Sequence, residues 1–151
     1  MKTMKWMMTL MTALCLSSPL LHGHDEHGTK KAGPNGGRLL TSTEPHAEFF
    51  VTPERKVRIT FLGEDGKPVL PEKAEASLTG GDRANPTKLT FTKDGTSLLS
   101  DKPLPEGQNV PVVLRFSAGS EKPVTEKFGV NLADCEECQH KEYACTCAHG
   151  S

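Results

Sequence analysis

The sequence predicts an all-β protein, and three observations support this prediction. The chain of 151 residues contains 14 glycines and 11 prolines, which indicates many turns. Apolar and polar residues alternate in several short runs, as they do in strands with one buried face. No stretch of about ten residues keeps an apolar period of 3.6, so a long helix is not expected. We therefore expect an antiparallel β-sandwich of about seven strands.

Residues 1–23 have the organisation of a secretory signal peptide. Lys2 and Lys5 precede an apolar run at 6–16, which is shorter than the about 20 apolar residues needed to cross a bilayer. We expect cleavage near Gly23 and a periplasmic or secreted mature protein without a membrane span. A lipoprotein is not expected, because Leu14 stands before Cys15 where a lipoprotein signal has a small residue.

The next two segments differ in composition. Residues 24–37 are rich in glycine, lysine and histidine and predict a flexible arm that ends in a turn. Residues 38–132 contain the alternating runs, at 47–51, 57–61, 89–91, 112–116 and 124–130, separated by turn signals such as 64–67 and 93–96. All six phenylalanines lie in this sandwich region, and we expect five of them in the core and Phe50 on the opposite face of its strand.

Residues 133–151 form a cysteine- and histidine-rich tail with little to bury, which we expect to be a separate module. A Cys-x2-Cys pair and a Cys-x-Cys pair can supply the thiolates of a tetrahedral Zn²⁺ site or of a Cu(I) site with fewer ligands. The sequence therefore predicts a bound copper or zinc ion and leaves open which of the two it is. The candidate ligands are the four thiols and two imidazoles of the tail: Cys135, Cys138, Cys145, Cys147, His140 and His149.

Two other interpretations of the tail stay open. An exported chain meets an oxidising compartment, so the four cysteines can form two disulfides without a metal. The Cys-x2-Cys pair can also be redox-active, although no strand–helix–strand pattern precedes Cys135, as it does in proteins with that chemistry.

A second metal site is a further hypothesis, with His24, His27, His46 and Glu48 as candidate ligands. His24 would be the mature N-terminus, where an α-amine and an imidazole together chelate Cu(II). His46 and Glu48 stand two apart on an expected strand and therefore project from one face. The alternative is that the arm and this strand face are simply solvated.

The middle of the chain resembles a known family. The segments that carry the likeness are Gly36–Leu40, Pro45–Val51, Lys56–Leu62 and Asp65–Val69. They are similar to the small β-domain associated with periplasmic adaptor subunits of RND-type heavy-metal efflux systems and to its stand-alone exported relatives. The resemblance implies a periplasmic β-domain in metal handling, with His46 and Glu48 as the matching polar pair. The position before Gly36-Gly37, often histidine in that family, is Asn35 here.

Composition and motifs argue against several classes of function. A formal net charge of −1 argues against nucleic-acid binding, which needs a basic face. The sequence has no nucleophile elbow, phosphate loop or zinc-protease motif, so we do not expect an enzyme. We expect an exported soft-metal-binding protein that acts as a carrier, a buffer or an accessory to heavy-metal efflux, with a pump adaptor as a candidate partner. One alternative is an exported interaction domain with a disulfide-bonded tail, and a minor one is a copper histidine-brace oxidase built on His24 and His46.

Overall fold

The structure, a computed structural model, describes residues 31–119 and 122–147. The expected signal peptide, His24, His27 and His149 lie outside these residues. Among the described residues, no helix has the length and hydrophobicity needed to cross a bilayer.

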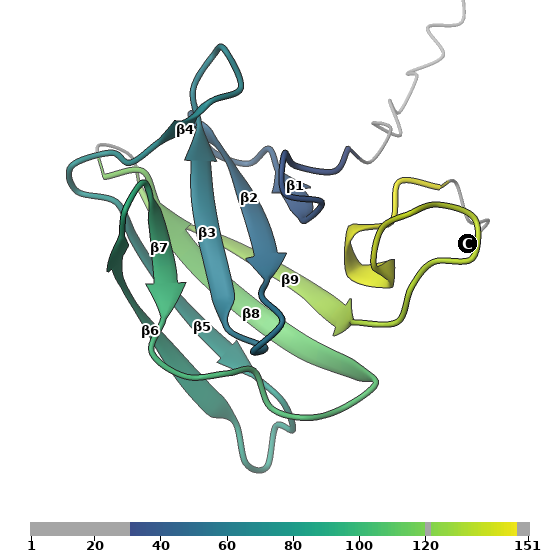
Figure 1. The fold of residues 1–151 in the computed structure, drawn as a ribbon. Coiled ribbons are helices and arrows are strands. Elements are labelled where there is room, and N and C mark those ends of the chain that lie inside the picture. The colour runs from purple at the N-terminus through teal and green to yellow at the C-terminus, as the bar shows by residue number, and fades with distance from the viewer. Residues whose placement is uncertain (1–30, 120–121, 148–151) are drawn as a thin grey trace, which may run out of the picture.

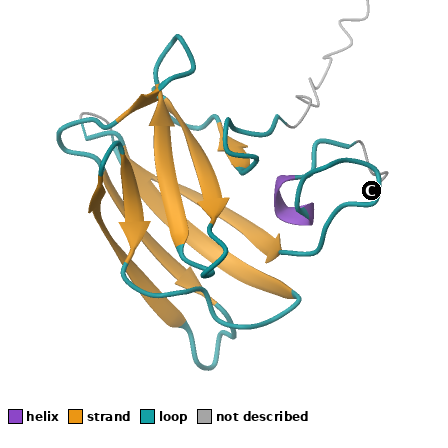
Figure 2. Ribbon diagram, viewed as in Figure 1, coloured by secondary structure: helices purple, strands orange, loops and turns teal. Residues whose placement is uncertain are grey.

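The described residues fold into nine antiparallel strands, which confirms the predicted all-β class (Figures 1 and 2). The order across the sheet is β1-β2-β3-β7-β6-β5-β8-β9, and β4 pairs with β3 beside this path. The strands are β1 (Arg38–Leu40), β2 (His46–Val51), β3 (Val57–Leu62), β4 (Pro68–Val69), β5 (Glu75–Gly80), β6 (Thr87–Asp94), β7 (Ser97–Ser100), β8 (Asn109–Ser117) and β9 (Val124–Asn131).

Strand β6 joins the two layers of the sandwich. Its first half, up to Thr90, pairs with β5, and its second half, from Phe91, pairs with β7. One layer therefore contains β1 to β4 and β7, and the other contains β5, β8 and β9 (Figure 1). The strand path curls from one layer into the other through β6, so the sheet closes on that side of the molecule.

The core lies between the layers and is formed by the alternating apolar residues of the facing strands. Phe61 of β3 and Phe116 of β8 are buried, and their ring centroids lie 6.4 Å apart across the layers. Phe49 of β2 meets Phe128 of β9 edge to face at 5.0 Å. Aromatic pairs of this kind add about 0.5–1.5 kcal/mol each beyond the area that they bury. Phe50 is only partly buried on the other face of β2, as expected.

Turn residues in the sequence predicted the hairpins, whereas the alternation of apolar residues did not predict strands that contain few of them. Gly66 and Gly95 adopt positive φ angles of 73° and 59° in the two Asp-Gly turns, a conformation that glycine reaches without steric cost. Strand β5 (Glu75–Gly80) was not among the expected runs because only Leu78 and Gly80 are buried in it. Strand β7 was missed because it is only four residues long.

The open side of the sandwich lies between β1 and β9, the two ends of the strand order. The Arg38 guanidinium of β1 stacks 4.6 Å above the Phe128 ring of β9. The 3₁₀ helix η1 (Glu142–Ala144) of the C-terminal tail contacts both end strands. Figures 1 and 2 show the tail beside β1 and the end of β9. The tail thus covers an edge that would otherwise expose apolar side chains.

Candidate metal centre

The C-terminal tail packs onto the sandwich through Tyr143. Its side chain is 4% exposed, and its ring meets Phe49 edge to face at 5.9 Å. The Val51 N–H at the end of β2 donates a hydrogen bond of 3.0 Å to the Tyr143 hydroxyl. Ala144 also belongs to the hydrophobic core. This corrects the expectation that the tail has little to bury: one aromatic residue joins it to the main core.

Backbone hydrogen bonds shape the first half of the tail into a small hairpin. The Cys135 N–H donates to the His140 carbonyl at 3.0 Å, and the Glu142 N–H donates to the Ala133 carbonyl at 2.9 Å. An ion pair also joins the two ends of this hairpin: Lys141 Nζ lies 2.6 Å from Asp134 Oδ1. This ion pair is exposed and contributes at most about 1 kcal/mol. The hairpin turns Cys135 and Cys138 toward the η1 helix, which presents Cys145 at its end.

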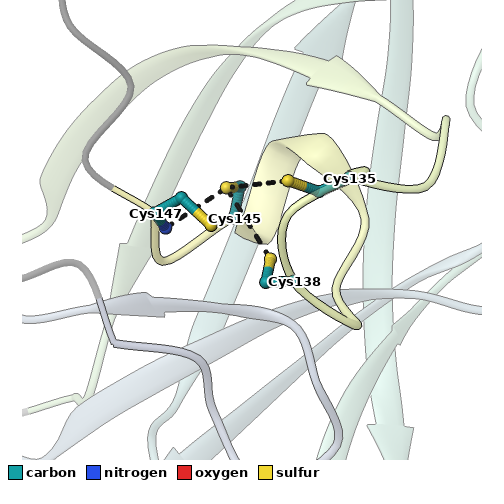
Figure 3. A group of neighbouring side chains, drawn as sticks. All are labelled: Cys135, Cys138, Cys145 and Cys147. Atoms are coloured by element: carbon teal, nitrogen blue, oxygen red, sulfur yellow. Dashed lines mark hydrogen bonds between the residues drawn. The ribbon is translucent and has the colours of Figure 1, made fainter.

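The four cysteines of the tail converge on one point (Figure 3). The Sγ atoms of Cys135 and Cys145 are 3.4 Å apart, and those of Cys138 and Cys145 are 3.8 Å apart. All four sulfurs, including that of Cys147, lie within 4.8 Å of one another. A tetrahedral site with Zn–S bonds of about 2.3 Å has sulfur–sulfur edges of about 3.8 Å. The cluster is therefore close to the dimensions of a four-thiolate metal site.

None of these four cysteines is in a disulfide. A disulfide joins its sulfurs at about 2.05 Å, whereas the Cys135 and Cys145 sulfurs are 3.4 Å apart. Cys135 and Cys145 are buried, and Cys138 and Cys147 are partly exposed. The cluster thus has two buried cysteines and two that solvent reaches in part.

Backbone amides and burial shift the pKa values of the thiols in opposite directions. The N–H groups of His140 and Thr146, the former having the larger effect, lower the pKa of the Cys138 thiol to about 6. Burial raises the pKa of Cys145 and of Cys147. The Cys147 N–H donates to Cys145 Sγ at 3.3 Å. Hydrogen bonds from amides to sulfur stabilise thiolates, which are the form that ligates metals.

The sequence also nominated His140, and the structure places its ring outside the sulfur cluster. A Cβ built on Gly36 would lie 3.6 Å from His140 Nδ1, so the ring faces the turn before β1. There His140 lines a cleft of about 660 Å³ together with Phe50, Arg55 and Tyr143. The backbone of His140 is nevertheless joined to the cluster, through its carbonyl to Cys135 and its N–H to Cys138.

Glu48 of the proposed second site is fully buried and holds the turn before β1. Its Oε1 accepts hydrogen bonds from the Asn35 N–H at 2.9 Å and the Gly37 N–H at 2.8 Å, and its Oε2 accepts one from Asn35 Nδ2 at 2.6 Å. A Cβ on Gly33 would collide with the same carboxylate. The Glu48 carboxylate therefore accepts hydrogen bonds from Asn35 and Gly37 and holds this turn in place.

His46 does not meet Glu48, because its Nε2 lies 2.8 Å from Glu44 Oε1. Among the described residues, the tail cysteines are the one group of His, Cys, Asp and Glu side chains close enough to hold a metal ion. His24, His27 and His149 fall outside the described residues.

Sequence reasoning missed Tyr143, which anchors the tail, and did not place Glu48 at the turn before β1. Tyr143 is the single tyrosine of the chain, and a lone aromatic residue in a polar tail was the signal for a buried anchor. Glu48 was noticed, but as a ligand. Gly33, Gly36 and Gly37 around Asn35 were the signal that a backbone turn approaches its carboxylate closely.

The described residues thus provide four clustered thiols that could bind a metal ion, on a tail anchored to an antiparallel β-sandwich. Four sulfur ligands favour soft or borderline ions such as Zn²⁺ and Cu(I) over Ca²⁺ or Mg²⁺. No protein-family model, curated protein or solved structure matches this chain.

Proposed function

We propose that this protein is an exported metal-handling protein that binds one thiophilic ion, Zn²⁺ or Cu(I), at Cys135, Cys138, Cys145 and Cys147. The observation that carries the proposal is the convergence of four sulfurs within 4.8 Å of one another. A packed core does not need four thiols at one point, whereas a tetrahedral ion does. The leader pattern and the resemblance to domains of heavy-metal efflux adaptors support export and a role in metal handling.

A carrier or buffer must give up its ion, and the cluster has a side suited to exchange. Cys138 and Cys147 are partly exposed, so the thiolates of a second protein can approach the ion from that side. Cys135 and Cys145 are buried and would hold the ion while ligands exchange. We therefore propose a carrier or buffer role, with a pump adaptor or another periplasmic metal protein as the partner.

Metal titration of the reduced protein tests this proposal. We expect one Zn²⁺ or one Cu(I) per chain, with release of thiol protons, because only thiolates ligate. The double variant Cys135→Ser, Cys138→Ser should lose tight binding and keep the circular dichroism spectrum of the sandwich.

Two control variants separate this centre from the other candidate ligands. His140→Ala and His46→Ala should bind as tightly as the natural chain, because neither ring belongs to the cluster. If the reduced chain binds neither ion at micromolar concentration, the proposal is wrong and the interaction-domain alternative is preferred.

A further inference from the structure

We propose that the cleft beside the C-terminal tail is a second binding site, which takes a small carboxylic acid with an apolar body. The cleft has a volume of about 660 Å³ and is lined by residues of the turn before β1, the end of β2 and the tail. Small-molecule sites have volumes of about 300–1,000 Å³. No cysteine is among the described residues that line it, so this inference goes beyond the proposed function and does not rest on it.

Phe50 gives this cleft an aromatic wall that the protein core does not use. Its side chain lies on the outer face of β2, is only partly buried and is not part of the hydrophobic core. Pro53 and Leu132 also line the cleft, and Tyr143 adds a second aromatic ring. A ligand that covers these side chains removes apolar surface from water, which favours binding. The cleft therefore suits a molecule with an apolar body, and an aromatic one can stack on these rings.

Arg55 brings a positive charge into the same cleft and has no acidic partner among the described residues. The ion pairs in that part of the chain all join other side chains. The Arg55 Nη2 donates a hydrogen bond of 2.5 Å to the uncharged Pro105 carbonyl, and its Nε is buried without a hydrogen-bond partner. A guanidinium that is partly removed from water and meets one neutral acceptor favours an anion beside it. Since Nε is covered, the anion would pair with N–H groups of the Nη atoms.

The turn between β2 and β3 holds Arg55 in place before a ligand arrives. The Arg55 N–H donates to the Thr52 carbonyl at 2.8 Å, and the Arg55 carbonyl accepts from the Leu104 N–H at 2.8 Å. Its φ of 62° lies in the left-handed region, which residues other than glycine rarely adopt. Residues that are held in such conformations cluster at ligand-binding sites. A charge that is fixed in advance lowers the entropy cost of binding.

The charges of the cleft favour a single carboxylate as the anion. Lys141 also lines the cleft, but its Nζ lies 2.6 Å from Asp134 Oδ1, so these two charges neutralise each other. The unpaired charge is that of Arg55, and a planar guanidinium matches the two oxygens of a carboxylate. An inorganic anion would leave Phe50 in water, and an uncharged apolar molecule would leave Arg55 unpaired. A carboxylic acid with an apolar body satisfies both side chains.

Nuclear magnetic resonance of the isotope-labelled, reduced full chain tests the inference, with 3-phenylpropionate as the probe. We expect saturable shifts of the backbone amides of Phe50, Arg55 and Gln139, which line the cleft, with a dissociation constant of about 1 mM. The amide of Val113 in β8, outside the cleft, should not shift. Two related compounds separate the contributions. 3-Phenylpropionamide has the ring without the charge, acetate has the charge without the ring, and each should bind at least about tenfold more weakly.

Four variants assign the binding to the two side chains that carry the inference. Arg55→Met removes the charge at similar length and should weaken binding at least about tenfold, whereas Arg55→Lys keeps a charge and should bind more tightly than Arg55→Met. Phe50→Thr removes the aromatic wall and should also weaken binding. Arg115→Met removes an exposed guanidinium from β8, outside the cleft, and is the matched control that should bind as the natural chain does. The remaining amide shifts report whether each variant is folded, and the comparison of acid with amide needs no variant.

The inference is overturned if the cleft amides show no saturable shift at about ten times the expected dissociation constant. Equal affinity for the acid and the amide, or an Arg55→Met variant that binds as tightly as the natural chain, also overturns it. A peptide that ends in phenylalanine and binds where 3-phenylpropionate does not would assign the cleft to a chain terminus instead. Binding that is seen only after Asp25→Asn and Glu26→Gln would assign the cleft to that segment of the chain.

Metal titration of the same sample separates this inference from the proposed function. A chain that binds Zn²⁺ or Cu(I) but not 3-phenylpropionate overturns the cleft site alone. A chain that binds 3-phenylpropionate but neither ion supports the cleft site and overturns the proposed function alone.

Discussion

Replacing Tyr143 by phenylalanine tests whether the tail is part of the folded domain. The substitution keeps the ring that packs on Phe49 and removes the hydroxyl that accepts the Val51 N–H at 3.0 Å. This hydrogen bond is buried, so its loss leaves a backbone donor without a partner, which costs about 1–3 kcal/mol. For a domain of this size, we expect the melting temperature to fall by about 3–6 °C per kcal/mol.

Urea denaturation followed by circular dichroism measures the loss in free energy of unfolding. Thr92→Val, which removes an exposed hydroxyl from β6, is the matched control and should change stability by less than about 0.5 kcal/mol. Tyr143→Ala should cost more, up to about 3–5 kcal/mol, unless the tail detaches first. If Tyr143→Phe is as stable as the natural chain, the contacts between the tail and β2 do not stabilise the folded protein. Our account of the preformed metal centre is then wrong.

Three further predictions follow from the centre and its supports. Glu48→Ala should lower the free energy of unfolding by about 2 kcal/mol in urea titrations, because the Asn35 amide and the buried Gly37 amide lose their acceptor, whereas Glu48→Gln keeps one acceptor oxygen and should cost less. Equal losses in both variants would contradict the role of the hydrogen bonds. Burial, with a smaller effect of the Glu48 charge, raises the pKa of Tyr143 above its usual 10.0. The contribution of Tyr143 to the free energy of unfolding should therefore be fully present below about pH 10. It should be lost as the pH rises further, because the tyrosine of the unfolded chain ionises at a lower pH than that of the folded chain. Tyrosinate absorbance measures this pKa, and ionisation at the ordinary value would show an exposed ring. Metal affinity should weaken as the pH falls toward about 5, because protons compete for the thiolates. A pH-independent affinity in competition with a chelator would exclude thiolate ligation.

The sequence by itself determined the class of the fold and the chemistry of the tail. Alternation in β2, β3 and β8 depends on which side of a strand each residue faces, which is a local property. The Asp-Gly turns are local as well, since the backbone conformation depends on the residue at one position. The donor set of the tail follows from composition, because four of the five cysteines stand within thirteen residues.

Only the tertiary structure decided how these parts combine. The shift of β6 from one layer to the other depends on long-range pairing of its two neighbours, because β7 pairs with β3 in one layer and β5 pairs with β8 in the other. The assignment of Glu48 to the turn before β1, rather than to a metal, depends on the approach of Asn35 from thirteen residues away. Tyr143 reaches Val51 across a separation of 92 residues, and this contact anchors the cysteine cluster to the sandwich. Contacts of this kind are set by the packing of the whole chain, so no local pattern of residues encodes them.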